Sequence, residues 1–459
     1  MGFSSAFAPA GPAGRSAGVR AGRGLRAVFA PALVLLALLF CLLAPAEAFC
    51  REAEPQEPAK WYEQVGDWLS DSVQLSGWLE TIHGTRLLST DEPITSRVQG
   101  RAEAAVNWSS FYGFVSLDAE LNWIVDQNSH IAPREAWLEY ASDSWSLRFG
   151  RQIIVWGKAD GLRVTDNICP VDYSDFMNRN LDNMRIPVTA ALLRLSGETL
   201  VTDLVWIPEF RPAVFPERDD PWGALFSFSD SPYMRMRDSE LPPFSLENSE
   251  FGMRVAGYFS NFDISASVLH TWDDLPVYDS AVVYSAQGPY VEITPKYKRM
   301  TVLGLDVSVP WSDFVFRAEG AVFLDRHLTA LTPGDSVRRK NTVKWLVGVD
   351  WSPGGDWSVT AQFSDEQILD YEEDLNSKEH RHTGTLNISK KFLNQTLTVS
   401  NMLYVMTDDR AWADRFQVEY SLMDGMTIAA GIDWIDGSDG TYREMTKNSQ
   451  IWTRLKYSF

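Results

Sequence analysis

The sequence has few of the residues on which catalytic and metal sites depend. Its 459 residues include only three cysteines and six histidines. None of the histidines stands in a recognisable catalytic motif, and the sequence contains no P-loop, zinc-finger or dinucleotide-binding fingerprint. His380 and His382 could bind a metal, but a single H-x-H pair in an acidic loop is a weak pattern. We therefore expect no enzyme, no cofactor and no metal site.

Long apolar runs are also scarce. Beyond residue 48 no stretch is long enough for a membrane-spanning helix, which needs about 20 apolar residues. The mean hydropathy is -0.18, close to that of a soluble protein. A transmembrane β-barrel has a similar average, because lipid-facing and lumen-facing residues alternate along each strand. The 18 Trp, 15 Tyr and 24 Phe favour the barrel, since aromatic belts mark membrane interfaces.

Basic residues are fewer than acidic ones. Lys and Arg number 41 against 61 Asp and Glu, which gives a formal net charge of -20. This balance argues against nucleic acid or an anionic lipid surface as a partner. The charge balance alone indicates no particular ligand.

The N-terminus has the features of an export signal. Four arginines precede a compact apolar stretch from Val28 to Leu43, and Ala46-Glu47-Ala48 forms a cleavage site. We expect a signal peptide over residues 1–48 and a periplasmic segment over 49–72, with a short amphipathic helix near Trp61 to Ser72. A retained anchor helix is less favoured, because the run is short and contains Pro31. The amphipathic helix is expected to pack at the barrel rim rather than to plug the pore.

From Val73 onward the apolar pattern has a period of two. Val98 to Trp108 alternates apolar residues with polar and charged ones, and Phe111 to Trp123 repeats the pattern. Such long alternation exceeds a typical globular strand and fits a tilted membrane strand. About 18 segments of this kind (16–18) predict an all-β, transmembrane antiparallel β-barrel over residues 73–459. They lie near 73–88, 98–108, 111–123, 134–141, 145–152, 189–196, 200–207, 250–259, 262–271, 299–309, 314–323, 342–351, 357–366, 382–391, 396–405, 412–422, 426–435 and 449–459.

The connections between these segments alternate between short and long. Short turns such as Trp108-Ser-Ser-Phe111 and Met423-Asp-Gly425 are followed by longer loops, which is the outer-membrane pattern. Aromatic pairs flank the short turns and predict a periplasmic girdle: Trp108 with Phe111, Phe259 with Phe262, and Trp351 with Trp357. The last strand, Ser449 to Phe459, should pair with the first near Gly77 and Trp78. Its alternating Leu455, Tyr457 and terminal Phe459 are similar to the signal that the barrel assembly machinery reads in Gram-negative bacteria.

One stretch carries a family resemblance. Gly150-Arg151-Gln152, Trp156-Gly157 and Asp160, then Val205-Trp206-Ile207-Pro208 and Phe210, resemble a porin-like family of Gram-negative bacteria. That family looks related to alginate-export-type barrels, and Leu75 to Glu80 also matches it. The resemblance covers roughly residues 73–212 and implies a pore or an export duct, without naming a solute.

The loop from about Gly157 to Pro187 is the main candidate site. Long loops in compact folds are often functional, and in porins such a loop folds inward and opposes charges on the wall. An external loop over the barrel mouth is the alternative. The second long loop, Pro208 to Asn248, is expected to be an external cap. The charged residues of the candidate constriction loop are Lys158, Asp160, Arg163, Asp166, Asp172, Asp175, Arg179, Asp182 and Arg185.

The strand pattern also predicts the charged residues of the lumen wall. Acidic residues outnumber basic ones there, which predicts a weak cation preference. The alternative is that many of these charges pair across the wall and only stiffen it. Cys50 and Cys169 would remain after cleavage and can pair in an oxidising periplasm, or stay unpaired. The predicted wall residues are Arg97, Arg101, Glu103, Asp118, Glu120, Arg148, Arg254, Arg317, Glu319, Lys344, Asp350, Arg415, Glu419 and Arg454.

Three functions fit the sequence. The leading one is passage of small hydrophilic solutes through a channel in the outer membrane of a Gram-negative bacterium. The others are a duct for an exported polymer or lipid-like cargo, and a non-conducting barrel that binds a surface partner. Outer-membrane lipid, the barrel assembly machinery and small solutes are the expected partners. A homo-oligomer is also compatible with the sequence.

Overall fold

The computed structural model describes residues 72–90, 92–175, 181–223, 231, 233–438 and 440–459. The contact pattern divides the chain into two units, and every described residue belongs to the first, which is treated by itself here. The expected signal peptide, the expected N-terminal helix up to residue 71, and Cys50 lie outside these residues. They stay predictions.

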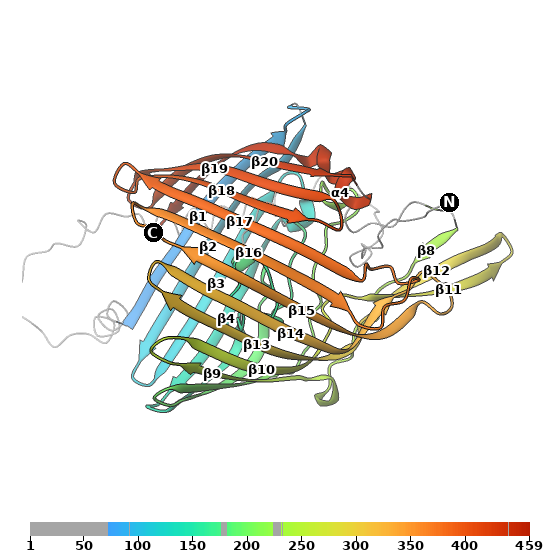
Figure 1. Ribbon diagram of the computed structural model, residues 1–459, viewed down its shortest axis with the longest axis horizontal. Coiled ribbons are helices and arrows are strands. Elements are labelled where there is room, and N and C mark those ends of the chain that lie inside the picture. The colour runs from blue at the N-terminus through green and yellow to red at the C-terminus, as the bar shows by residue number, and fades with distance from the viewer. Residues whose placement is uncertain (1–71, 91, 176–180, 224–230, 232, 439) are drawn as a thin grey trace, which may run out of the picture. The chain divides into compact units, whose positions relative to one another are not determined.

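The described residues form an antiparallel barrel of 18 strands (Figure 1). All 18 predicted segments are confirmed as strands of this barrel. The strands are β1 (Val73–Arg86), β2 (Pro93–Trp108), β3 (Phe111–Asn122), β4 (His130–Ala141), β5 (Trp145–Gln152), β6 (Val188–Ser196), β7 (Leu200–Ile207), β9 (Glu250–Tyr258), β10 (Asp263–Trp272), β13 (Arg299–Trp311), β14 (Phe314–Thr329), β15 (Val337–Trp351), β16 (Trp357–Ile368), β17 (His380–Phe392), β18 (Leu397–Met406), β19 (Ala411–Met423), β20 (Met426–Gly437) and β21 (Gln450–Ser458).

The last strand closes the barrel on the first. Trp78 on β1 stands opposite Ser458 on β21, and Gly77 and Phe459 exchange both backbone hydrogen bonds at 3.0 Å. The predicted pairing of the two terminal strands is therefore confirmed. Closure satisfies the backbone groups that an open sheet would expose at its edges, which a lipid environment requires.

The short and long connections lie at opposite ends of the barrel, here named the turn end and the loop end. The predicted aromatic pairs stand at the turn end: Trp108 stacks on Phe111 and Phe259 on Phe262, with ring centroids 6.2 and 4.9 Å apart. Trp351 packs on Phe314 at 5.9 Å rather than on Trp357. These rings form the expected girdle at one rim.

The connections at the loop end contain secondary structure that the alternation did not predict. A separate three-stranded sheet is formed there by β8, β11 and β12, and its β11–β12 hairpin projects beyond the rim (Figure 1). No described helix is long and apolar enough to span a membrane. The bounds of these smaller elements are β8 (Met234–Met236), β11 (Val277–Ser285), β12 (Gly288–Lys296), α3 (Leu181–Met184), α4 (Gly440–Met445), η2 (Asp126–Asn128), η5 (Leu246–Asn248) and η6 (Thr446–Asn448).

The two faces of the wall have opposite character. On β3, Val115, Leu117 and Leu121 are exposed on the outside, while Ser116 and Glu120 are buried on the inside. A soluble protein would bury the apolar face instead. An apolar exterior with a polar interior is the arrangement of a transmembrane barrel.

Candidate functional site

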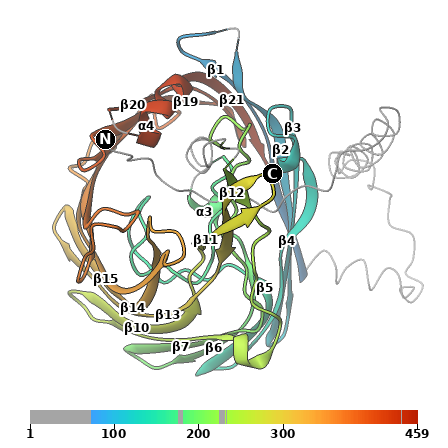
Figure 2. The ribbon, with the colours of Figure 1, turned by 90° about the vertical axis from the view of Figure 1, so that its right-hand side faces the viewer.

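The described residues of the connection between β5 and β6, 153–175 and 181–187, lie inside the barrel. Figure 2 looks along the barrel from the loop end and shows this segment within the ring of strands. It contacts Glu319 on β14 and Arg97 on β2. These two strands stand nine places apart around the 18-stranded wall in either direction. The loop therefore crosses the lumen from one side to the other, which favours the inward alternative over an external loop.

Glu319 anchors the outgoing part of the loop, residues 158–165, to β14. This carboxylate is 4% exposed and accepts hydrogen bonds from the backbone N–H groups of Lys158, Ala159 and Thr165, and from the Thr165 hydroxyl at 3.0 Å. Arg317, on the same strand, donates to the Lys158 carbonyl at 2.9 Å. Hydrogen bonds to a buried charged group are among the stronger ones in proteins. One wall carboxylate thus fixes the position of residues 158–165.

Two further residues of the outgoing part meet the wall. The Lys158 ammonium lies 3.3 Å from Asp306 on β13 and 3.9 Å from Asp263 on β10. The side-chain amide of Gln362 on β16, oriented to satisfy both of its ends, bonds the backbone N–H and C=O of Asp160 at 3.0 and 3.1 Å. The loop is therefore attached to several strands of the same side.

Arginines of the opposite wall bind the returning part of the loop, at Asp175, Asp182 and Asn183. Arg97 on β2 forms a buried ion pair with Asp175. Arg101 on β2 donates to the Asn183 side chain at 3.4 Å, and Arg134 on β4 donates to the carbonyl of Asp182 at 2.6 Å. These contacts confine the loop from the second side.

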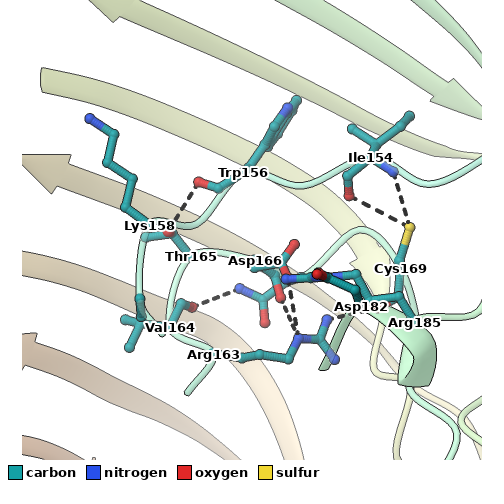
Figure 3. Close-up of polar contacts among 12 residues, drawn as sticks. Ile154, Trp156, Lys158, Arg163, Val164, Thr165, Asp166, Cys169, Asp182 and Arg185 are labelled. Carbon is teal, nitrogen blue, oxygen red and sulfur yellow. Dashed lines mark hydrogen bonds and ion pairs between the residues drawn. The ribbon is translucent and has the colours of Figure 1, made fainter. Parts of the chain in front are cut away.

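The remaining charged residues of the loop bind mainly to one another (Figure 3). Arg185 lies 2.9 Å from Asp166 and 2.5 Å from Asp182. Arg163 donates to the carbonyl oxygens of Asp166 and Cys169 at 2.8 and 2.7 Å. Asp172 accepts the backbone N–H of Ser174 at 2.9 Å, and Arg179 lies outside the described residues. These contacts give the loop its internal shape.

The wall beneath the loop is apolar, which the sequence reading did not predict. Inward-facing Val188, Leu192, Val205 and Ile207 on β6 and β7 are buried with residues of β10 and β13 to β15. Trp156, Val164 and Ile168 of the loop pack against this surface. The signal was present in β6 and β7, since the runs Ala190 to Leu193 and Leu204 to Ile207 are apolar on both faces. Apolar burial therefore adds to the polar anchors that hold the loop inside.

Cys169 belongs to this apolar contact. The thiol is buried and forms no disulfide with a described residue; it bonds the backbone N–H and C=O of Ile154 at 3.3 and 3.5 Å (Figure 3). A disulfide with Cys50 stays a prediction, because that residue is not among the described ones.

We expect Cys169 to resist alkylation in the folded barrel. Burial raises the pKa of its thiol to about 12, and the thiolate is the reactive form. In a Cys50→Ser background, maleimide labelling should stay slow from neutral to mildly alkaline pH and become fast only after denaturation. Mass spectrometry of the labelled chain measures this. Fast labelling of the native protein would contradict the packing described here.

Most charged residues of the wall pair with a residue on the next strand or, for Arg254 and Arg454, on the next strand but one. These pairs neutralise one another locally and stiffen the wall, as the sequence reading allowed. The ion pairs are Arg101 with Asp118, Arg148 with Glu139, Arg194 with Asp203, Arg254 with Asp306, Arg317 with Asp350, Lys344 with Glu366, Arg415 with Asp433 and Arg454 with Glu419. Glu103 accepts from Ser76 and Glu120 from Asn122, at 3.4 and 2.9 Å.

The connection between β7 and β9 packs on the inward loop. Tyr173 stacks on Phe215 with centroids 5.5 Å apart, and Trp222 donates to Asp175 at 3.2 Å. Asn448, from the β20–β21 connection, donates to the carbonyl of Pro221. The expected external cap therefore continues into the mouth of the barrel, where it supports the crossing loop.

Comparisons with known proteins fit this architecture. The profile of a family described as "Protein of unknown function (DUF1302)" matches residues 127–442. No curated protein matches the sequence. OccK3 (OpdO) of Pseudomonas aeruginosa has a similar structure, with a TM-score of 0.51 and 10% identity over 87% of this chain and 99% of that one. OccK2 (OpdF) of the same species, solved in complex with glucuronate, gives 0.50 and 13% over 85% and 98%.

At these identities the structural similarity shows the barrel fold alone. It agrees with the porin-like part of the resemblance found in the sequence. The relation to alginate-export-type barrels stays a prediction.

Proposed function

We propose that this chain, which belongs to the DUF1302 family, is a porin-like channel of the Gram-negative outer membrane that passes small hydrophilic solutes. The observation that carries the proposal is the loop of residues 153–187. Barrels of this strand number are wide enough to leave an aqueous lumen. A polar and charged loop held across that lumen narrows it, and a narrowing of this kind sets the size and charge of what passes.

The proposal includes the location and the assembly of the protein. We infer that residues 1–48 are removed during export and that Leu455, Tyr457 and Phe459 form the assembly signal. The exposed apolar belt of the wall supports a lipid environment. The mass of the protein in detergent distinguishes a monomer from a homo-oligomer.

Single-channel recording on the purified protein tests the proposal. We expect discrete openings, and liposome swelling with a panel of sugars, amino acids and anions should show a cut-off in solute size. A barrel that produces no openings and no swelling would be a surface-binding protein instead.

We expect a weak preference for cations. Most wall charges are paired, so only a modest excess of acidic groups acts on a passing ion. Lys158 balances Asp263 and, together with Arg254, Asp306, so Lys158→Met should strengthen the preference. Reversal potentials in a salt gradient measure both effects. Lys378→Met is the matched control, because Lys378 pairs with Asp409 in the connections at the loop end. Anion selectivity of the wild-type channel would contradict this prediction.

A further inference from the structure

Two histidines and an aspartate meet on the outward face of the wall, at the loop end of β16 and β17. Asp365 on β16 stands opposite His382 on β17 in the strand register, and His380 is two residues away on the same face. Phe363, one step nearer the turn end, is exposed to the outside and stacks on the His382 ring with centroids 5.9 Å apart. The cluster is therefore separate from the lumen, into which the neighbouring Glu366 points toward Lys344.

The donor atoms of the three side chains converge. The Asp365 carboxylate lies 3.2 Å from His380 Nδ1 and 3.7 Å from His382 Nε2, and one donor atom from each residue falls within 4.8 Å of the other two. Two ligands of a tetrahedral Zn²⁺ ion, each at about 2.0–2.2 Å, stand roughly 3.3 Å apart. The observed separations need only small side-chain movements to reach that geometry. The two imidazole rings are parallel, with an interplanar angle of 3°.

A fourth residue, Asp408, hydrogen-bonds His382 in the way that carboxylates orient metal-bound histidines in other proteins. Asp408, in the connection between β18 and β19, accepts from His382 Nδ1 at 3.0 Å and from the His382 backbone N–H at 2.6 Å. This directs Nε2 of His382 toward Asp365. A carboxylate that bonds the far nitrogen of a ligating histidine fixes its tautomer and raises its basicity. The exposed fractions of the His380 and His382 side chains, 37% and 34%, leave the site open to solvent.

We propose that Asp365, His380 and His382 bind a divalent transition-metal ion at the loop end, with Asp408 as the residue that positions His382. Imidazole and carboxylate ligands suit Zn²⁺, and water would complete the coordination. The ion would join β16 to β17 and, through Asp408, to the β18–β19 connection. The sequence reading gave the H-x-H pair but no metal site, because Asp365 comes from strand β16 and Asp408 from the β18–β19 connection, and only the fold brings them to it.

Zinc titration of the full chain in detergent, purified without a histidine tag and stripped with a chelator, tests the proposal. Calorimetry should show one equivalent of bound Zn²⁺, and Co²⁺ should give the visible absorption of a tetrahedral site. His380→Ala, His382→Ala and Asp365→Asn should each abolish the tight site. Asp408→Asn should leave the stoichiometry intact and weaken the affinity by about 10–100-fold.

Two controls keep the outcome clear. His130→Ala removes a histidine outside the cluster and should leave binding unchanged. The heat-modifiable mobility of each variant in gel electrophoresis shows whether the barrel is folded. No saturable binding, or equal binding by the His380→Ala/His382→Ala double variant, would overturn the proposal and leave only hydrogen-bonded His–Asp pairs. Channel conductance is measured apart from this site, so the two proposals can fail independently.

Discussion

In the Glu319→Ala variant the single-channel conductance should rise several-fold and become noisier. Four hydrogen-bond donors of the loop, from Lys158, Ala159 and Thr165, lose their common acceptor. Each hydrogen bond to a buried charged group contributes about 1.5–3 kcal/mol. The outgoing part of the loop would keep only its contacts with Arg317, Asp306 and Gln362 and its apolar packing. A loop that is less firmly attached to β14 can move within the lumen, which widens the path for ions and allows the width to fluctuate.

Glu139→Ala is the matched control for this variant. Glu139 is also an inward carboxylate on a strand, but its partner is Arg148 on the neighbouring strand and not the loop. It should change the conductance little. Glu319→Gln should fall between the two, since its amide keeps one acceptor oxygen. Equal conductance in wild type and Glu319→Ala would mean that the crossing loop does not limit the current.

The sequence was sufficient for the barrel because alternation is a local property. Each strand alternates along its own length, as between Val98 and Trp108, and each short turn joins two neighbours. Antiparallel pairing of consecutive strands then follows without information from distant residues. The closure between Gly77 and Phe459 follows as well, because an even number of strands returns the chain to its starting end.

The candidate site was less predictable because its contacts are between distant segments. Lys158, Asp175 and Arg97 were all named as charged residues of the loop or the wall. The alternation gave no means to pair Arg97 with Asp175 or to identify Glu319 as the anchor of a backbone segment. The apolar inner surface of β6 and β7 was hidden for a related reason. A strand that is apolar on both faces still looks like a membrane strand, and only the packing of Trp156, Val164 and Ile168 explains its inner face.

The second large effect is expected in the Gly77→Ala variant, at the pairing of β1 with β21, here named the seam. A Cβ atom on Gly77 would stand 2.4 Å from the backbone oxygen of Arg101 and 2.7 Å from the ring of Phe459. Backbone on β2 cannot move aside as a flexible side chain can, so β1 must shift where it pairs with β21. Overpacking of this kind costs about 1–3 kcal/mol. The folded, heat-modifiable fraction should fall strongly, and Gly77→Val should abolish it.

Gly320→Ala separates this clash from the general effect of replacing a strand glycine. A Cβ on Gly320 meets no heavy atom within 4 Å, and its residue also lies in a barrel strand. Its folded fraction and thermal midpoint should equal those of the wild type or exceed them slightly, because alanine reduces the conformational freedom of the unfolded chain. If Phe459→Ala partly rescues Gly77→Ala, the terminal ring is the obstacle. If Phe459→Ala gives no rescue, the obstacle is the Arg101 carbonyl. Equal stability of Gly77→Ala and Gly320→Ala would mean that the seam between β1 and β21 is looser than described here.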